Sequence, residues 1–274
     1  MKARVFIRRT AMTPTDELAF TSDQPPFTLP EVDAIHVSVA FTWDMAKAER
    51  MAEAWRAVGV PVLMGGPAFN LPGGEFVPGL YLKDGCTITS RGCPNHCWFC
   101  AVPQREGGLR ELPIQDGWNV MDDNLLACST DHIEKVFQML ERQKHGAVFT
   151  GGLESNLLKP WIAKRLKEIK TERMYFAYDM PGEYEPLVEA GRMLFEAGFT
   201  NNHSAMNCYN LIGYKGDTFD KAEKRLQQTW DAGFMPFAML YRDEQGNMDH
   251  EWRKFQRLWA RPMIVRTRQK EVAQ

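Results

Sequence analysis

Three of the chain's six cysteines lie within eight positions, in the stretch Thr-Ser-Arg-Gly-Cys-Pro-Asn-His-Cys-Trp-Phe-Cys that ends at residue 100. They are Cys93, Cys97 and Cys100, separated by three and then two residues. Three thiolates on one loop can bind three corners of a cubane iron–sulfur cluster and leave the fourth iron without a protein ligand. The spacing therefore predicts an iron–sulfur centre with one iron open to a small molecule.

A structural zinc ion is the alternative, with Cys86 or His96 as its fourth ligand. Closed zinc sites have four ligands, commonly in two separated pairs, so a single loop of three cysteines suits zinc poorly. With zinc, the chain would be a non-catalytic α/β binding module. Cys86 and Cys128 have no neighbouring cysteine in the sequence and are expected to be small buried residues, so a second cluster is not predicted.

The stretch Cys-Pro-Asn-His-Cys-Trp-Phe-Cys resembles the motif of the radical S-adenosylmethionine (radical SAM) superfamily. The flanking Thr-Ser-Arg-Gly and Arg-Glu-Gly-Gly look most like its cobalamin-associated and methylthiotransferase-like branches, and the resemblance covers about residues 81–243. It implies a [4Fe-4S] cluster on the three cysteines and an external electron donor such as a flavodoxin or ferredoxin. It also implies that SAM is cleaved to methionine and a 5'-deoxyadenosyl radical, which abstracts hydrogen from an unidentified polar substrate. Isomerisation, methylation, sulfur insertion and lyase outcomes all stay open.

The same resemblance implies contacts with SAM at the ends of successive strands. It places the SAM amine at Asp122 or Asp123, where the family usually has Gly-Gly-Glu, and makes Glu154 a further candidate. The other implied contacts are backbone approach at Gly151 and Gly152, the ribose or carboxylate at Tyr178 and Asp179, and adenine at Phe99, Leu211, Ile212 and Gly213. Cys208 and Tyr209 are candidates to donate a hydrogen atom to a substrate radical, with simple packing as the alternative for Cys208.

These residues must be positioned by alternating strands and helices, the pattern of parallel α/β architecture. Strands at 4–8, 34–41 and 61–64 with a helix at 44–58 predict a small N-terminal βαβ layer, and the Pro- and Gly-rich residues 67–80 predict a linker. Further strands are predicted near 87–90, 118–121, 147–151, 173–178, 206–212 and 235–241. Helices are predicted at about 131–144, 158–170, 184–197, 218–232 and 250–260.

Six parallel strands with outer helices predict a partial six-strand (β/α)6 TIM-like barrel, whose site lies at the carboxyl ends of the strands. The expected division is residues 1–80 as the N-terminal layer and linker, 81–245 as the barrel, and 246–274 as a C-terminal helix and basic tail. The N-terminal layer resembles a truncated, Rossmann-like part of a cobalamin-binding domain. It lacks an Asp-x-His-x-x-Gly segment, so we expect a remnant that buttresses the barrel and no bound cobalamin.

Composition is that of a soluble globular protein, with 274 residues, 44% hydrophobic residues and a formal net charge of -2. No run has the length of a membrane span or signal sequence, so we expect a cytoplasmic protein without a membrane partner.

Residues 252–270 contain seven basic and no acidic residues, which makes modification of a nucleic-acid base the alternative radical SAM function. Trp252, Phe255 and Trp259 instead have the spacing of a helix that packs its apolar face on a core.

Overall fold

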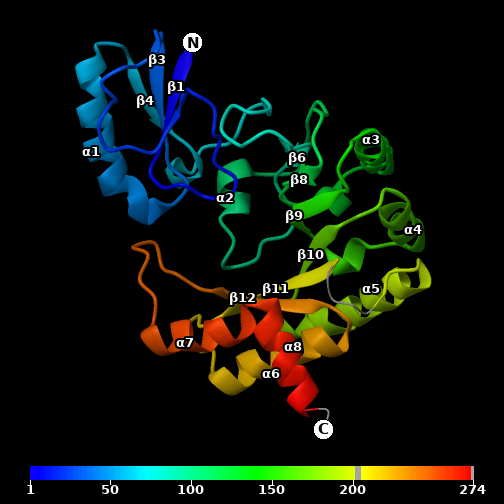
Figure 1. Ribbon diagram of the computed structural model, residues 1–274. Coiled ribbons are helices and arrows are strands. Elements are labelled where there is room, and N and C mark those ends of the chain that lie inside the picture. The colour runs from blue at the N-terminus through cyan, green and yellow to red at the C-terminus, as the bar shows by residue number, and fades with distance from the viewer. Residues whose placement is uncertain (201–204, 273–274) are drawn as a thin grey trace. The chain divides into compact units, whose positions relative to one another are not determined.

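The protein divides into two compact units, Met1–Gly117 (unit 1) and Trp118–Gln274 (unit 2). The structure is a computed structural model that describes residues 1–200 and 205–272 (Figure 1). Each unit is built on its own α/β pattern. The finer division expected at residues 80 and 245 stays a prediction.

Unit 1 contains a parallel four-stranded sheet in the order β2-β1-β3-β4. Its strands are β1 (Lys2–Phe6), β2 (Ala19–Phe20), β3 (Ala34–Ser38) and β4 (Val62–Gly65). Helix α1 (Met45–Trp55), flanked by the 3-10 turns η1 (Thr42–Asp44) and η2 (Arg56–Val58), packs Trp55 and Met51 against Ile35 in one apolar core. The predicted βαβ layer is confirmed. Strand β2 was not predicted because two residues are too few to show a periodicity.

The rest of unit 1 is mostly irregular chain with short elements. These are η3 (Pro67–Phe69), β5 (Cys86–Thr87), β6 (Ser90–Arg91), α2 (Val102–Glu106) and β7 (Arg110–Glu111). The strand predicted near 87–90 is therefore divided into β5 and β6. Strand β6 pairs antiparallel with β7, which creates a hairpin that the sequence patterns did not indicate.

Unit 2 contains five parallel strands whose spatial order follows the chain, from β8 through β9, β10 and β11 to β12. They are β8 (Asn119–Val120), β9 (Val148–Leu153), β10 (Arg173–Ala177), β11 (Met206–Ile212) and β12 (Met235–Leu240). The helices between or after them are α3 (Thr130–Glu141), α4 (Pro160–Glu168), α5 (Tyr184–Glu196), α6 (Phe219–Asp231), α7 (His250–Trp259) and α8 (Pro262–Val272), with the 3-10 turns η4 (Leu125–Ala127), η5 (Ser155–Leu157) and η6 (Pro181–Glu183). The predicted parallel α/β architecture is confirmed.

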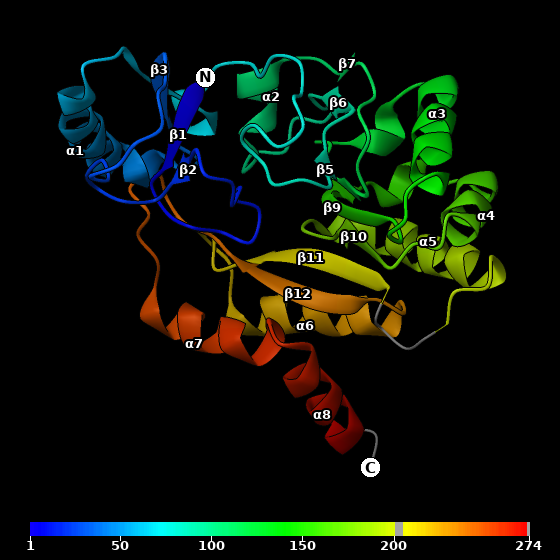
Figure 2. The same cartoon turned by 45° about the horizontal axis from the view of Figure 1, so that its top comes forward.

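The two faces of the unit 2 sheet differ. Met174 and Phe176 of β10 and Cys208 of β11 are fully buried on the helix-covered face, and Figure 2 shows α6 lying along β11 and β12. Side chains alternate between faces along a strand, so Tyr175 and Tyr209 point to the other face. There the two rings stack at 4.5 Å between centroids and are half-buried. This second face carries the aromatic side chains that a ligand could contact.

Helix α7 packs on unit 2 through the three aromatic residues that the spacing had placed on one face. Trp259 is 1% exposed, and Trp252 and Phe255 pack against the same apolar cluster, which contains Ile212 and Leu226. The packing interpretation of these aromatics is confirmed. Of the basic residues in this segment, the side chains of Arg268 and Lys270 lie outside the described part of the chain.

Within residues 1–200 and 205–272, none of the helices combines the length and the apolar character that crossing a membrane requires.

Candidate functional site

The three cysteines lie on a long loop of unit 1 that is closed at its base by β6 and β7. Ser90 pairs with Glu111 and Arg91 with Arg110 across this base. Gly92 has a φ of +85°, and a Cβ at this position would lie 2.4 Å from the carbonyl oxygen of Gly108. Only glycine fits both requirements. Gly92 and the pair Gly107–Gly108, which flank the cysteine motif in the sequence, therefore lie together where the two ends of the loop meet, and we call this point the neck of the loop.

Within the loop, all three cysteines are half-buried. The backbone N–H of Cys100 donates to the carbonyl oxygen of Cys97 at 3.0 Å, which makes a tight turn. Trp98, in this turn, is 58% exposed and meets the ring of Phe99 edge-on at 5.4 Å. The implied adenine contact at Phe99 therefore lies in the same turn as two of the thiols.

No group of three or more His, Cys, Asp or Glu side chains in the described ranges is close enough to hold a metal ion. The thiols are thus not gathered into a finished ligand set. Their chemistry nevertheless fits an iron–sulfur cluster, because thiolates are its usual ligands and metal binding is coupled to the ordering of its ligands. Of the two alternative zinc ligands, His96 is exposed, and Cys86 is buried with its Sγ 3.7 Å from Met12 Sδ.

Glu106, six residues after the third cysteine, binds residues at both ends of the loop, and we call this group of contacts the clamp. Its side chain is 1% exposed and lies 2.9 Å from Arg105, 2.9 Å from Arg110 and 3.6 Å from Arg91. The backbone N–H of Gly73 also donates to it at 2.9 Å. Burial alone would raise the pKa of Glu106, but the hydrogen bonds from Arg105 and Gly73 and the arginine charges hold it below its usual value. The sequence indicated Arg-Glu-Gly-Gly only as part of the radical SAM resemblance and did not predict that Glu106 forms this clamp.

In unit 2, the ends of β8 and β9 bring several predicted SAM contacts together. A Cβ at Gly151 would lie 2.1 Å from the carbonyl oxygen of Asp122, so glycine is required there by the packing of the two strands. Asn124 Nδ2 donates to Glu154 Oε2 at 2.7 Å. Gly152 has a φ of +103° and no atom within 4 Å of its Cβ position. Asp122 is buried and Asp123 half-buried, so the two candidate aspartates differ in environment.

Ser155 follows Glu154 and is a residue that sequence reasoning missed. Its Oγ is buried and makes no hydrogen bond with any described residue. A buried polar atom without a partner is costly unless it binds something. Ser155 therefore fits a polar ligand group at the end of β9, and the sequence signal was the Glu-Ser pair that follows the two glycines.

The predicted contacts on β10 and β11 separate into two environments. The hydroxyl of Tyr178 donates to Gln228 of α6 at 2.8 Å, so this side chain is turned to the helices. Ile212 is fully buried, and a Cβ at Gly213 would lie 3.0 Å from the Trp252 ring. These three residues pack against helices, whereas Leu211, half-buried, extends from the other face of the sheet.

Asp179, at the end of β10, is tied to β11 by its side chain. Its Oδ1 accepts a hydrogen bond from the backbone N–H of Leu211 at 2.5 Å. Burial, together with the charge of Glu183, raises the pKa of Asp179 to about 6, against the opposing effects of the Leu211 N–H and Arg225. The folded protein therefore retains a proton here at a pH where the unfolded chain has released it.

This shift predicts how stability depends on pH. The folded pKa lies above the ordinary value of 3.8, so the free energy of unfolding should fall as pH rises from about 4 to about 6. Asp179→Asn removes this contribution and keeps the oxygen that accepts from Leu211. Urea unfolding of both proteins at several pH values should show wild type losing stability relative to the variant across that interval. A difference that does not change with pH would contradict the assignment.

Cys208 and Tyr209 are neighbours on β11 and lie on opposite faces. Cys208 is fully buried among the helices, and burial raises the pKa of its thiol well above the ordinary value. Tyr209 lies on the aromatic face, where burial also raises the pKa of its hydroxyl and the Oη lies 3.4 Å from the carbonyl oxygen of Thr150. Tyr209 is thus the candidate hydrogen donor on the face that a ligand could contact.

The sequence matches no protein-family model, and no curated protein matches it either. The functional interpretation therefore depends on the residues themselves. These are a glycine-necked loop with three thiols in unit 1, and acidic, hydroxyl and glycine residues at the strand ends of unit 2.

Proposed function

We propose that the protein is a radical SAM enzyme that holds one [4Fe-4S] cluster on Cys93, Cys97 and Cys100. The observation that carries the proposal is the cysteine loop, because it offers three soft ligands rather than four and its two ends are joined by a glycine neck. The proposal includes a partial (β/α)6 barrel, a reducing cytoplasm and an external donor such as a flavodoxin or ferredoxin. It includes no cobalamin.

When bound, the cluster would supply one electron that splits SAM into methionine and a 5'-deoxyadenosyl radical, which becomes 5'-deoxyadenosine on taking a hydrogen atom. The chain's own residues would bind and orient. Asp122, Asp123 and Glu154 are acceptors for the ammonium group of SAM, since a carboxylate forms its strongest hydrogen bonds with charged donors. The orphaned Ser155 hydroxyl adds a polar contact beside Glu154. Tyr209 is a phenol on the aromatic face and could donate its hydrogen atom to a substrate radical, which would leave a tyrosyl radical for the external donor to reduce with one electron and one proton.

The test is SAM cleavage by the wild-type protein, purified without oxygen and reconstituted with iron and sulfide. We expect brown protein with about four iron ions per chain. After reduction by dithionite in the presence of SAM, we expect 5'-deoxyadenosine, measured by mass spectrometry. Fully reconstituted protein that forms no 5'-deoxyadenosine would overturn the proposal. Colourless protein that contains only zinc would favour the binding module instead.

A further inference from the structure

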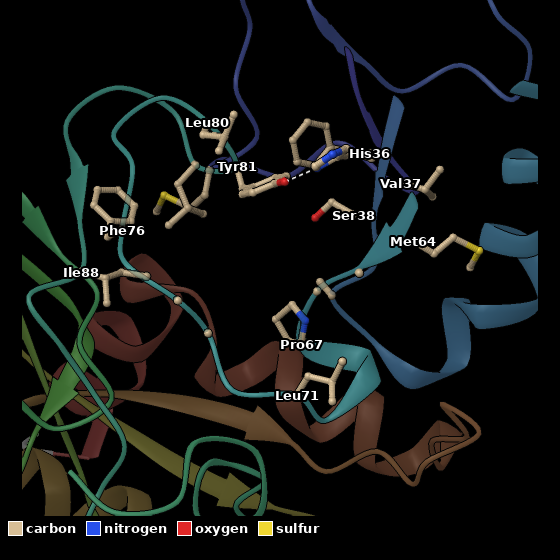
Figure 3. Close-up of a pocket in the computed structure, with 18 of the residues that line it drawn as sticks. His36, Val37, Ser38, Met64, Pro67, Leu71, Phe76, Leu80, Tyr81 and Ile88 are labelled. Carbon is tan, nitrogen blue, oxygen red and sulfur yellow. Dashed lines mark hydrogen bonds between the residues drawn. The ribbon is translucent and has the colours of Figure 1, made fainter. Parts of the chain in front are cut away.

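Unit 1 contains a cavity of about 550 Å³ at the carboxyl ends of β1, β3 and β4 (Figure 3). Arg8, Ser38 and Gly65, at or just after these strand ends, line it. In open parallel sheets, ligands bind beyond the carboxyl ends of the strands, where the chain connections leave in opposite directions. The order β2-β1-β3-β4 puts that point between β1 and β3. The cavity lies at the place where such a sheet binds its ligand, and its volume suits a small molecule.

Apolar side chains are exposed around this cavity. Leu71 is 66% exposed and Leu63 is 55% exposed, although both line it. The same is true of Phe41, Val77 and Tyr81. Exposed apolar side chains that gather in one place mark a ligand-binding groove, whereas single ones carry no such meaning. A ligand bound in the cavity would therefore cover apolar side chains that are now exposed to solvent.

The charged side chains that line the cavity are mostly paired with one another. Arg8 Nε donates to Asp44 Oδ2 at 2.9 Å, and a second bond joins the same two side chains. Arg91 and Arg105 both lie against Glu106. Glu75 is exposed to solvent. A charged ligand would have to disrupt one of these pairs or lose its own hydration, so the lining favours an uncharged one.

Two polar features could orient a ligand in the cavity. Figure 3 shows the Ser38 hydroxyl directed into it, and none of the hydrogen bonds among the described residues involves this hydroxyl. His36 Nδ1 and the Tyr81 hydroxyl are hydrogen-bonded to each other, and their rings lie nearly parallel, 16° apart. The cavity thus offers aromatic surface and a single unpaired hydroxyl.

We propose that unit 1 binds an uncharged, largely apolar small molecule with an aromatic ring system in this cavity. Phe41, whose ring stacks on Trp43 at 4.7 Å, and Tyr81, whose ring stacks on His36, supply the exposed parts of their rings as aromatic surface, and Ser38 supplies one hydrogen bond. The proposal does not depend on the cysteine loop being an iron–sulfur site. It gives the N-terminal layer a binding role in place of simple support.

Gly65 provides a way to fill the cavity without disturbing the sheet. A Cβ added there meets no atom within 4 Å, and its backbone is outside the left-handed region. Gly65→Leu should therefore direct its side chain into open space. Gly182, in unit 2, has the same two properties and is exposed, so Gly182→Leu is a matched control.

The experiment uses two fluorescent probes with the same rings, neutral N-phenyl-1-naphthylamine and its sulfonated relative 8-anilinonaphthalene-1-sulfonate. We expect saturable binding of one neutral molecule per chain, weaker by about tenfold in Gly65→Leu and unchanged in Gly182→Leu. We also expect the sulfonated probe to bind about tenfold more weakly than the neutral one, because the charge is not matched.

Three results would overturn the proposal. The first is the absence of saturable neutral binding in the wild type, and the second is its persistence in a folded Gly65→Leu. The third is tighter binding of the sulfonated probe, which would show that the site takes anions. If circular dichroism shows Gly65→Leu to be unfolded, Leu71→Asp replaces it, because that side chain is largely exposed and the change removes apolar contact without affecting the core. Unchanged neutral binding by Leu71→Asp would likewise contradict the proposal.

Discussion

Cys97→Ala should abolish formation of 5'-deoxyadenosine and leave the reconstituted protein nearly colourless. Two thiolates cannot replace three in holding a cubane cluster, so we expect 5'-deoxyadenosine to fall by at least about 100-fold, beyond the loss seen when a mere supporting residue is removed. Because Cys97 is half-buried on a loop, the free energy of unfolding of the protein without its cluster should change by less than about 0.5 kcal/mol. Iron content, visible absorbance and mass spectrometry of the products measure the effect.

The matched control is Cys128→Ala. Cys128 is buried in unit 2 at 8% exposure, so its replacement should cost about 1 kcal/mol of stability through lost packing and leave iron content and product unchanged. The radical SAM assignment fails if Cys97→Ala keeps a full complement of iron and forms 5'-deoxyadenosine. It also fails if the two cysteine variants lose iron equally.

Glu106→Ala should strongly destabilise unit 1. It leaves Arg91 and Arg105, each less than 20% exposed, without the carboxylate that they share. Breaking a buried ion pair costs about 3–5 kcal/mol, and we expect about 3 kcal/mol because Arg110 is partly exposed to water. Urea unfolding measures this loss. Glu53→Ala is the control, since Glu53 pairs with Arg56 on the exposed surface and its removal should cost less than about 1 kcal/mol.

Glu106 should also affect the cysteine loop, because its partners come from both sides of the neck. Glu106→Gln keeps the shape and a hydrogen-bond acceptor but loses the charge. We expect it to fold and to release iron to a chelator more readily than wild type, by about 10-fold or more in affinity. If Glu106→Gln is as stable as wild type and retains iron equally well, the clamp has no role in holding the loop.

Local patterns were sufficient for most helices and strands. The spacing of apolar residues at three or four positions in 44–58 and 184–197 predicted α1 and α5 to within a few residues. An amphipathic helix shows this period in its own sequence. Strands β9 to β12 were found for a similar reason, since buried parallel strands are short continuous apolar runs. The missed strands, β2 and the β6–β7 pair, have two residues each and so no period to detect. Two helices were also missed, the five-residue α2 and α8, which had been expected to be a basic tail.

The candidate site was predictable only in part. Cysteine spacing predicted Cys93, Cys97 and Cys100 as ligands, and the radical SAM resemblance implied Asp122 and Glu154 at strand ends, because these signals are local. The sequence did not show which residues of β11 point toward the helices, because that depends on how the sheet packs. In the structure Cys208 points toward the helices and Tyr209 points to the opposite face. Ser155 was missed because a serine after a strand is common in turns, and only burial without a partner distinguishes it.

The sequence by itself determined the class of chemistry to be tested, since the number and spacing of thiols decide how many irons a loop can bind. It also determined the order of most strands and helices. Only the tertiary structure decided how the cysteine loop is held. Glu106 contacts Arg91, 15 positions before it, and Gly73, 33 positions before it. The tertiary structure alone revealed the cavity of unit 1, whose lining comes from strand ends and linker residues that no local pattern joins. Contacts between distant positions form only when the chain packs, and these two features consist of such contacts.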